Sequence, residues 1–137
     1  MILLVGFYVD PALARMQEFL TCLERNLANE RISEVHLFLE EPGDSARLAA
    51  AHPVMRHPKL RLIPHGRRAT YREMFDHAHR NLAGRRAIVA NADIYFDHTL
   101  ARLDDVDLAG KLACLSRWDV LDDDSVRFFD HPSSQDA

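Results

Sequence analysis

The sequence has no apolar run of eighteen residues, so no segment has the length and composition of a membrane-spanning helix. Its apolar opening, Met1 to Val5, has no basic flank before it and no small-residue cleavage signal after it, and we interpret it as a strand rather than a signal peptide. Cysteine is scarce: Cys22 and Cys114 lie far apart without a CxxC spacing, which argues against a zinc site or a disulfide framework. We therefore expect both to be reduced packing thiols in a cytoplasmic protein.

Apolar residues are plentiful enough for one packed core, since 137 residues with 47% hydrophobic content predict a single domain. The net charge of -4 conceals two opposed blocks. Residues 52–86 contain nine Arg and Lys against two Asp and Glu, whereas residues 93–137 contain four against eleven. A nucleic-acid-binding face is disfavoured because the acidic block follows the basic block closely in the sequence and partly cancels its positive electrostatic field. An anionic ligand with a divalent cation fits better, although solvated surface charge is the simplest explanation of the counts.

Strands and helices alternate over the first two thirds of the sequence. The apolar run at 2–9 is typical of a strand buried on both faces. A helix is predicted over 11–28, begun by Asp10 and Pro11. Shorter strands are predicted at 35–39, 60–63 and 87–90, with a short helix and a loop within 44–59. The alternation predicts a three-layer α/β sandwich with a mainly parallel sheet, whose ligand lies at the carboxyl ends of the strands.

Local signals define the remaining elements. Thr70 and Glu73 have the spacing of a capping box, which predicts a helix that continues to about Leu82. Gly84 follows where a left-handed C-terminal cap is expected. The last third changes to a helical turn at 99–103 and to strands at 112–116 and 126–128. We expect these late strands to be antiparallel additions near the C-terminus.

The strand at 87–90 is followed by Asn91 and Asp93, two residues apart, at the carboxyl edge of the predicted sheet. A hard divalent cation prefers oxygen ligands, and one or two carboxylates are enough when a substrate diphosphate supplies the rest. Asp93 is therefore predicted to bind Mn²⁺ or Mg²⁺. The three-residue pattern alone more often marks a turn or a cap, and its position after a buried strand is what favours a metal site. Asp97 is interpreted as an N-cap for the next turn rather than as a further ligand.

Other candidate residues have simpler interpretations. His77 and His79 are two apart on the predicted helix, so their side chains diverge and we interpret both as surface positions. Arg67, Arg68 and Arg72 lie near the start of that helix, where free backbone N–H groups also favour anions. They could contact a diphosphate, and solvated arginines are the simpler alternative.

The segment AIVANADIYFD at 87–97 resembles the strand-ended DxD motif of GT-A-type nucleotide-sugar glycosyltransferases. The opening ILLVGFYVDP is similar to the first strand and loop that border the nucleotide, and FLEEPGDS is similar to the acidic strand end that contacts the base. The combination of TYREMFDHA, NADIYFD, LSRWDV and SSQDA resembles a little-characterised bacterial and viral group of glycosyltransferase family 2-like proteins.

The resemblance implies a Rossmann-like GT-A domain that binds a nucleoside diphosphate sugar through a divalent metal at Asp93. The sugar would pass to a hydroxyl of a glycan, lipid-linked or protein acceptor. The resemblance places Asn91 beside the ribose or the metal, and places Asp136 where related families have the general base that deprotonates the acceptor. A polar residue in a frayed terminus is the alternative for Asp136. The expected substrate-binding residues, which include two of the arginines above, are Tyr8, Glu40, Glu41, Arg68, Arg72 and Asn91.

Two features depart from the family pattern. Asn91 stands where the motif has its first aspartate, which removes one negative ligand. The chain is also expected to lack the C-terminal acceptor-binding part. A non-catalytic nucleotide-sugar-binding module or a truncated remnant is therefore the alternative. A nucleotidyltransferase is disfavoured because the segment after the first strand, GFYVDP, is not a glycine-rich phosphate loop.

Overall fold

The structure is a computed structural model that describes residues 1–41, 43–121, 123 and 125–129. It divides into two compact units, Met1–Asp104 and Asp105–Ala137, and each is described by itself. Asp136 lies outside the described residues, and every other predicted site residue belongs to the first unit. In the described part of the chain, no helix is long and apolar enough to cross a membrane.

A four-stranded parallel sheet forms the centre of the first unit. In spatial order its strands are β3 (Leu60–Pro64), β2 (Glu34–Leu39), β1 (Ile2–Phe7) and β4 (Ala87–Ala90). β1 is central, as its continuous apolar run predicted, and Val5 lies opposite Leu37 of β2 and Ala90 of β4. The α/β class and the parallel sheet are confirmed, and the strand order is compatible with a Rossmann-like fold.

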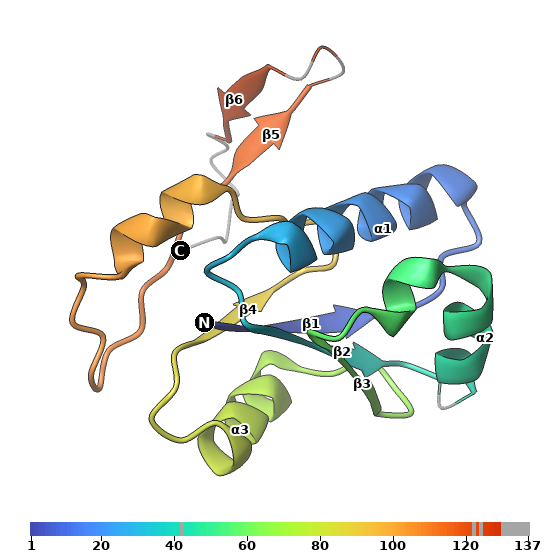
Figure 1. Ribbon diagram of the computed structural model, residues 1–137, viewed down its shortest axis with the longest axis horizontal. Coiled ribbons are helices and arrows are strands. Elements are labelled where there is room, and N and C mark those ends of the chain that lie inside the picture. The colour runs from blue at the N-terminus through green and yellow to red at the C-terminus, as the bar shows by residue number, and fades with distance from the viewer. Residues whose placement is uncertain (42, 122, 124, 130–137) are drawn as a thin grey trace. The chain divides into compact units, whose positions relative to one another are not determined.

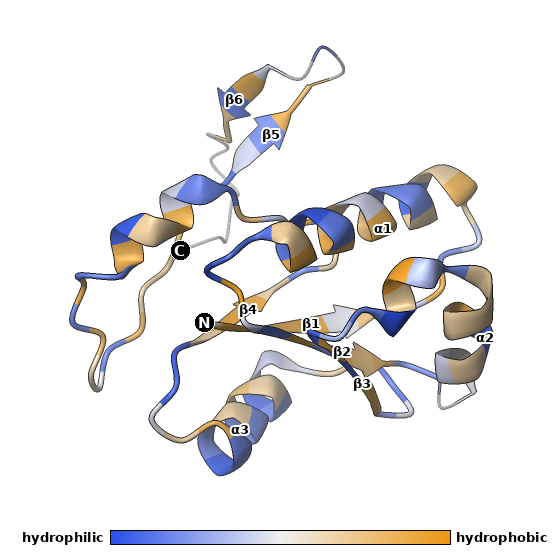
Figure 2. Cartoon of the chain, viewed as in Figure 1, coloured by the Kyte–Doolittle hydropathy of each residue, from blue (hydrophilic) through white to orange (hydrophobic). Residues whose placement is uncertain are grey.

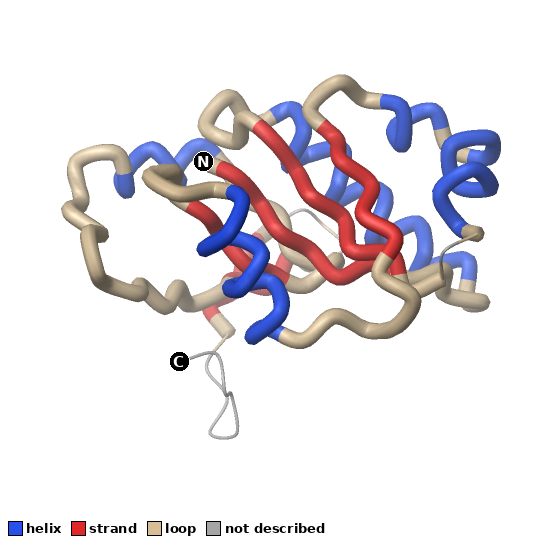
Figure 3. The backbone as a smooth tube through the Cα atoms, turned by 90° about the horizontal axis from the view of Figure 1, so that it is seen from below, coloured by secondary structure: helices blue, strands red, loops and turns tan. Residues whose placement is uncertain are grey.

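Helices cover both faces of this sheet (Figures 1 and 3). They are α1 (Leu13–Ala28), α2 (Asp44–Ala51), α3 (Tyr71–Asn81) and the 3-10 helices η1 (Pro53–Arg56) and η2 (His98–Leu103). One core lies between the sheet and α1, α2, η1 and η2, and the other lies under α3. Side chains of β1 alternate between the two cores: Leu3, Val5 and Phe7 belong to the first, and Ile2 and Leu4 to the second. Hydrophobic colours accordingly dominate β1, β2 and β4 in Figure 2.

The start of α1 differs from the prediction. α1 begins at Leu13 rather than at residue 11, and its N-cap residue, Ala12, has no side-chain cap. The Asp10 carboxylate instead accepts a hydrogen bond from the Ala12 N–H at 2.8 Å in the preceding turn. In β2, His36 and Phe38 are buried, like the apolar residues that alternate with them. The reason is that α3 covers this face of the sheet.

The N-terminal cap of α3 is as predicted. Thr70 Oγ1 accepts from the Glu73 N–H at 3.3 Å, and a Glu73 carboxylate oxygen accepts from the Thr70 N–H at 2.9 Å. Gly84 has a φ of 76°, which confirms the left-handed conformation expected after this helix.

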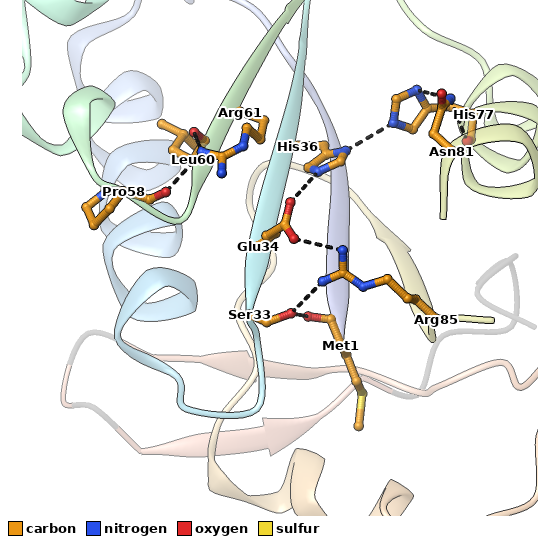
Figure 4. A network of polar contacts seen from close by, with 10 residues as sticks. All are labelled: Met1, Ser33, Glu34, His36, Pro58, Leu60, Arg61, His77, Asn81 and Arg85. Carbon is orange, nitrogen blue, oxygen red and sulfur yellow. Dashed lines mark hydrogen bonds and ion pairs between the residues drawn. The ribbon is translucent and has the colours of Figure 1, made fainter. Parts of the chain in front are cut away.

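A chain of polar contacts joins α3 to the sheet (Figure 4). His36 Nδ1 and His77 Nε2 are 3.0 Å apart, and His36 Nε2 is 3.2 Å from a carboxylate oxygen of Glu34. Glu34 also pairs with Arg85 at 2.8 Å. Burial, then the neighbouring charges of His36 and Arg80, lower the pKa of His77. His77 is therefore half-buried rather than a free surface residue, because this side of α3 lies against β2, whereas His79 is exposed as expected.

The second unit contains a two-stranded antiparallel sheet of its own. Its strands are β5 (Trp118–Val120) and β6 (Val126–Phe128), so the predicted strand at 126–128 is confirmed. The strand predicted at 112–116 is wrong, because those residues have no regular structure. Cys114 is exposed and is not a packing thiol, whereas Cys22 is buried as expected, and burial raises its pKa to about 11.

Candidate functional site

The carboxyl ends of β1 and β4 lie side by side in the sheet. From β1 the chain builds outward through α1 to β2 and then β3, whereas β4 lies on the opposite side of β1 and is reached through α3. The order of the strands therefore reverses between β1 and β4. Open α/β sheets bind ligands at the carboxyl ends of the strands beside such a reversal. Asn91 and Asp93 immediately follow β4 at this point.

An arginine from α1 holds Asp93. Arg15 Nη2 donates to Asp93 Oδ2 at 2.7 Å, and Arg15 Nη1 donates to Glu18 Oε2 at 2.6 Å. The guanidinium carbon lies 4.8 Å from the centre of the Phe19 ring. The hydrogen bond to Asp93, followed by the one to Glu18, raises the pKa of Arg15 above its usual range, so this residue stays charged. Sequence spacing gave no signal for the pair, which joins residues 78 apart.

The surroundings of Asp93 test whether it can hold the expected cation. Oδ1 is buried and has no hydrogen-bond partner among the described residues, and Oδ2 is bound to the guanidinium of Arg15. Mn²⁺ or Mg²⁺ needs an accessible oxygen with room for waters and substrate phosphates. This arrangement does not fit a divalent cation on Asp93, and the metal stays a prediction.

Asn91 is contacted by the first residue of α3. The Tyr71 hydroxyl donates to Asn91 Oδ1 at 3.3 Å, so the start of α3 reaches the carboxyl end of β4. The Tyr71 side chain is 56% exposed, which leaves its ring open to solvent beside the reversal. Tyr71 was not among the predicted binding residues, although its position directly after the capping Thr70 was a usable signal.

Asn26 of α1 and Asn29, the residue that follows the helix, fix the loop that contains Asp93. Asn26 is 3% exposed; its amide nitrogen donates to the Ile94 carbonyl at 2.9 Å, and its oxygen accepts from the Phe96 N–H at 3.0 Å. Asn29 donates to the Phe96 carbonyl at 2.8 Å. Asn26 was also missed, and the available signal was a polar residue directly before Leu27 on the apolar face of the helix.

A surface cleft of about 370 Å³ lies beside the end of β1. Its lining brings together three of the predicted binding residues, Tyr8, Glu40 and Glu41. The Tyr8 ring packs against Phe19 with centroids 5.2 Å apart, the same ring that Arg15 contacts. The cleft and the Arg15–Asp93 pair are therefore neighbours through Phe19.

The basic residues at the start of α3 have different surroundings. Arg67 lines the cleft and forms two hydrogen bonds to the Glu73 carboxylate. These bonds, with those from Thr70, lower the pKa of Glu73 to about 2. Arg68 and Arg72 are exposed and do not line the cleft. Of the predicted arginines, then, the cleft includes only the one that is already paired.

Three comparisons with known proteins gave no match. No family model, no curated protein and no solved structure matches the chain. The resemblance to glycosyltransferases therefore depends on the sequence motifs alone.

Proposed function

We propose that the first unit binds a nucleoside diphosphate sugar at the carboxyl ends of β1 and β4, as the donor-binding part of a GT-A-type glycosyltransferase. The main support is the reversal of strand order at this point, with Asn91 and Asp93 directly after β4. The motif AIVANADIYFD supplies these two residues, and Tyr8 and Glu40 line the cleft beside the end of the neighbouring strand β1.

The base and ribose of the donor fit the cleft. Its volume of about 370 Å³ lies at the low end of the roughly 300–1,000 Å³ range of small-molecule pockets, which suits a nucleoside better than a whole nucleotide sugar. The carboxylates of Glu40 and Glu41 can accept hydrogen bonds from N–H groups of a base or from ribose hydroxyls. The Tyr8 ring offers an apolar surface beside them.

The diphosphate then extends toward Asn91 and the start of α3. Transfer of the sugar leaves negative charge on the departing diphosphate, so positive groups placed there lower the barrier. Deprotonation of the acceptor hydroxyl by Asp136 stays a prediction, since this residue is not among those described.

A nucleotide-sugar-binding module without catalysis is the second candidate. Two observations favour it: residue 91 is an asparagine rather than an aspartate, and the Asp93 carboxylate is paired with Arg15. Both reduce the negative charge that is available to bind a catalytic metal. Donor binding without turnover would identify it.

Thermal unfolding with a panel of ligands tests the proposal. The chain is heated with UDP, GDP, ADP, CDP or dTDP and with the corresponding nucleotide sugars, with Mn²⁺ and with EDTA. A ligand that binds only the folded state must raise the midpoint, by an amount that grows with its concentration. We expect one base to give a shift, and Asp93→Ala to reduce it.

The Asp93→Ala variant also loses its pair with Arg15, so its midpoint without ligand is measured first and only the ligand-dependent shift is compared. Gln17→Ala, an exposed change on α1, serves as the control and should keep the full shift. Absence of a shift with all nucleotides would overturn the proposal.

A further inference from the structure

We infer that Arg15 takes the place of a divalent cation in this site, so that the donor diphosphate binds to the protein directly and without a metal. The inference rests on the proposed function above. It concerns which group supplies the positive charge at the reversal between β1 and β4.

The position of Arg15 is the first argument. It lies in the first turn of α1, just beyond the carboxyl end of β1, and reaches Asp93 just beyond the carboxyl end of β4. The guanidinium thus connects the first turn of α1, the helix that follows β1, to the loop after β4. Its contact with Phe19 links it to the side chain that also packs against Tyr8 of the cleft.

The hydrogen-bonding capacity of Arg15 is the second argument. A guanidinium has five N–H donors in one plane, a geometry that matches phosphate oxygens in pairs. Nη1 and Nη2 each make one of the described side-chain bonds, to Glu18 and Asp93. The Arg15 side chain is 40% exposed, so the remaining donors can meet an incoming anion.

The two carboxylate partners differ in how firmly they hold Arg15. The side chains of Arg15 and Glu18 are 40% and 48% exposed, and exposed pairs of this kind contribute little stability. Asp93 is 25% exposed and lies on a loop fixed by Asn26. A phosphate can therefore replace Glu18, while Asp93 continues to orient the guanidinium. Asp93 is on this account a positioning residue rather than a metal ligand.

The first test measures the affinity of the native chain for the five nucleoside diphosphates by calorimetry, in EDTA and in Mn²⁺. We expect one of them to bind with an affinity that changes less than about threefold between the two conditions. Binding that requires Mn²⁺ would overturn the inference while leaving the proposed function intact. Absence of binding in both conditions would overturn both.

The second test uses Arg15→Gln, with Arg25→Gln as the matched control. Arg25 lies on the same helix and is exposed, with its guanidinium 4.4 Å from the centre of the Tyr95 ring. Loss of a charge-assisted contact should weaken binding in EDTA by about 10- to 100-fold in Arg15→Gln, and Arg25→Gln should bind like the native chain.

Mn²⁺ gives a readout that a purely structural role of Arg15 would not change. Arg15→Gln frees Asp93 Oδ2, so we expect Mn²⁺ to restore part of the lost affinity in this variant and to have no effect on the native chain. Arg15→Lys keeps the charge without the planar fork and should bind in EDTA with intermediate affinity. Native affinity of a folded Arg15→Gln in EDTA would overturn the inference.

Discussion

Replacement of Asn26 by alanine tests whether the buried amide fixes the loop that contains Asp93. Asn26 makes two bonds to the backbone of this loop, to the Ile94 carbonyl at 2.9 Å and from the Phe96 N–H at 3.0 Å. The substitution removes both without changing a charge. The Ile94 carbonyl and the Phe96 N–H then lose their partner, the Asn26 side chain. Because Asn26 is only 3% exposed, water does not readily take its place.

The expected cost follows from the number and burial of these bonds. A neutral hydrogen bond contributes about 1 kcal/mol, and a buried group left without a partner costs about 1–3 kcal/mol. Two such groups give a loss of about 2–6 kcal/mol of unfolding free energy. At the lower limit, Tm should fall by roughly 6–12 °C in a chain of this size.

Urea denaturation and thermal unfolding measure the change, with Gln17→Ala as the control. Gln17 also has an amide and lies on α1, but it is exposed and its bond to Thr21 Oγ1 is long, at 3.5 Å. Its loss should cost less than about 0.5 kcal/mol. If Asn26→Ala is as stable as Gln17→Ala, the amide does not fix the loop and this reasoning is refuted.

Two further predictions concern α3. Because the folded chain resists protonation of His77, whose pKa is lowered by burial, the unfolded chain binds more protons below about pH 6.5 and stability should fall as the pH decreases from 7 to 5. Urea midpoints across this range should vary less in His77→Gln, whereas the exposed His79→Gln should keep the native slope; an unchanged slope in His77→Gln would exclude burial of His77 as the cause. Thr70→Ala removes the acceptor of the Glu73 N–H and should cost about 1 kcal/mol of unfolding free energy, while Thr70→Ser should be nearly neutral. Equal losses in the two Thr70 variants would contradict a capping role.

Prediction from the sequence failed where an element depends on its partner rather than on its own residues. The apolar stretch at 112–116 has the composition of a strand, but a strand forms only where another segment forms hydrogen bonds with its backbone. In the second unit the paired strands are β5 and β6 instead. The same dependence explains the burial of one side of His77, because the position of β2 beneath α3 cannot be read from the sequence of the helix alone.

The sequence by itself determined the elements whose signals lie within a few residues of one another. The apolar run predicted a central β1, the Thr70 and Glu73 spacing predicted the cap of α3, and Asn91 and Asp93 were correctly placed at the end of β4. Only the tertiary structure decided what surrounds them, because strand order brings together residues far apart in the chain. Arg15 meets Asp93 across 78 residues and Asn26 meets the Ile94 carbonyl across 68. No local sequence pattern predicts contacts between residues so far apart in the chain. These contacts arise because the strands lie parallel in a sheet that is buried on both faces.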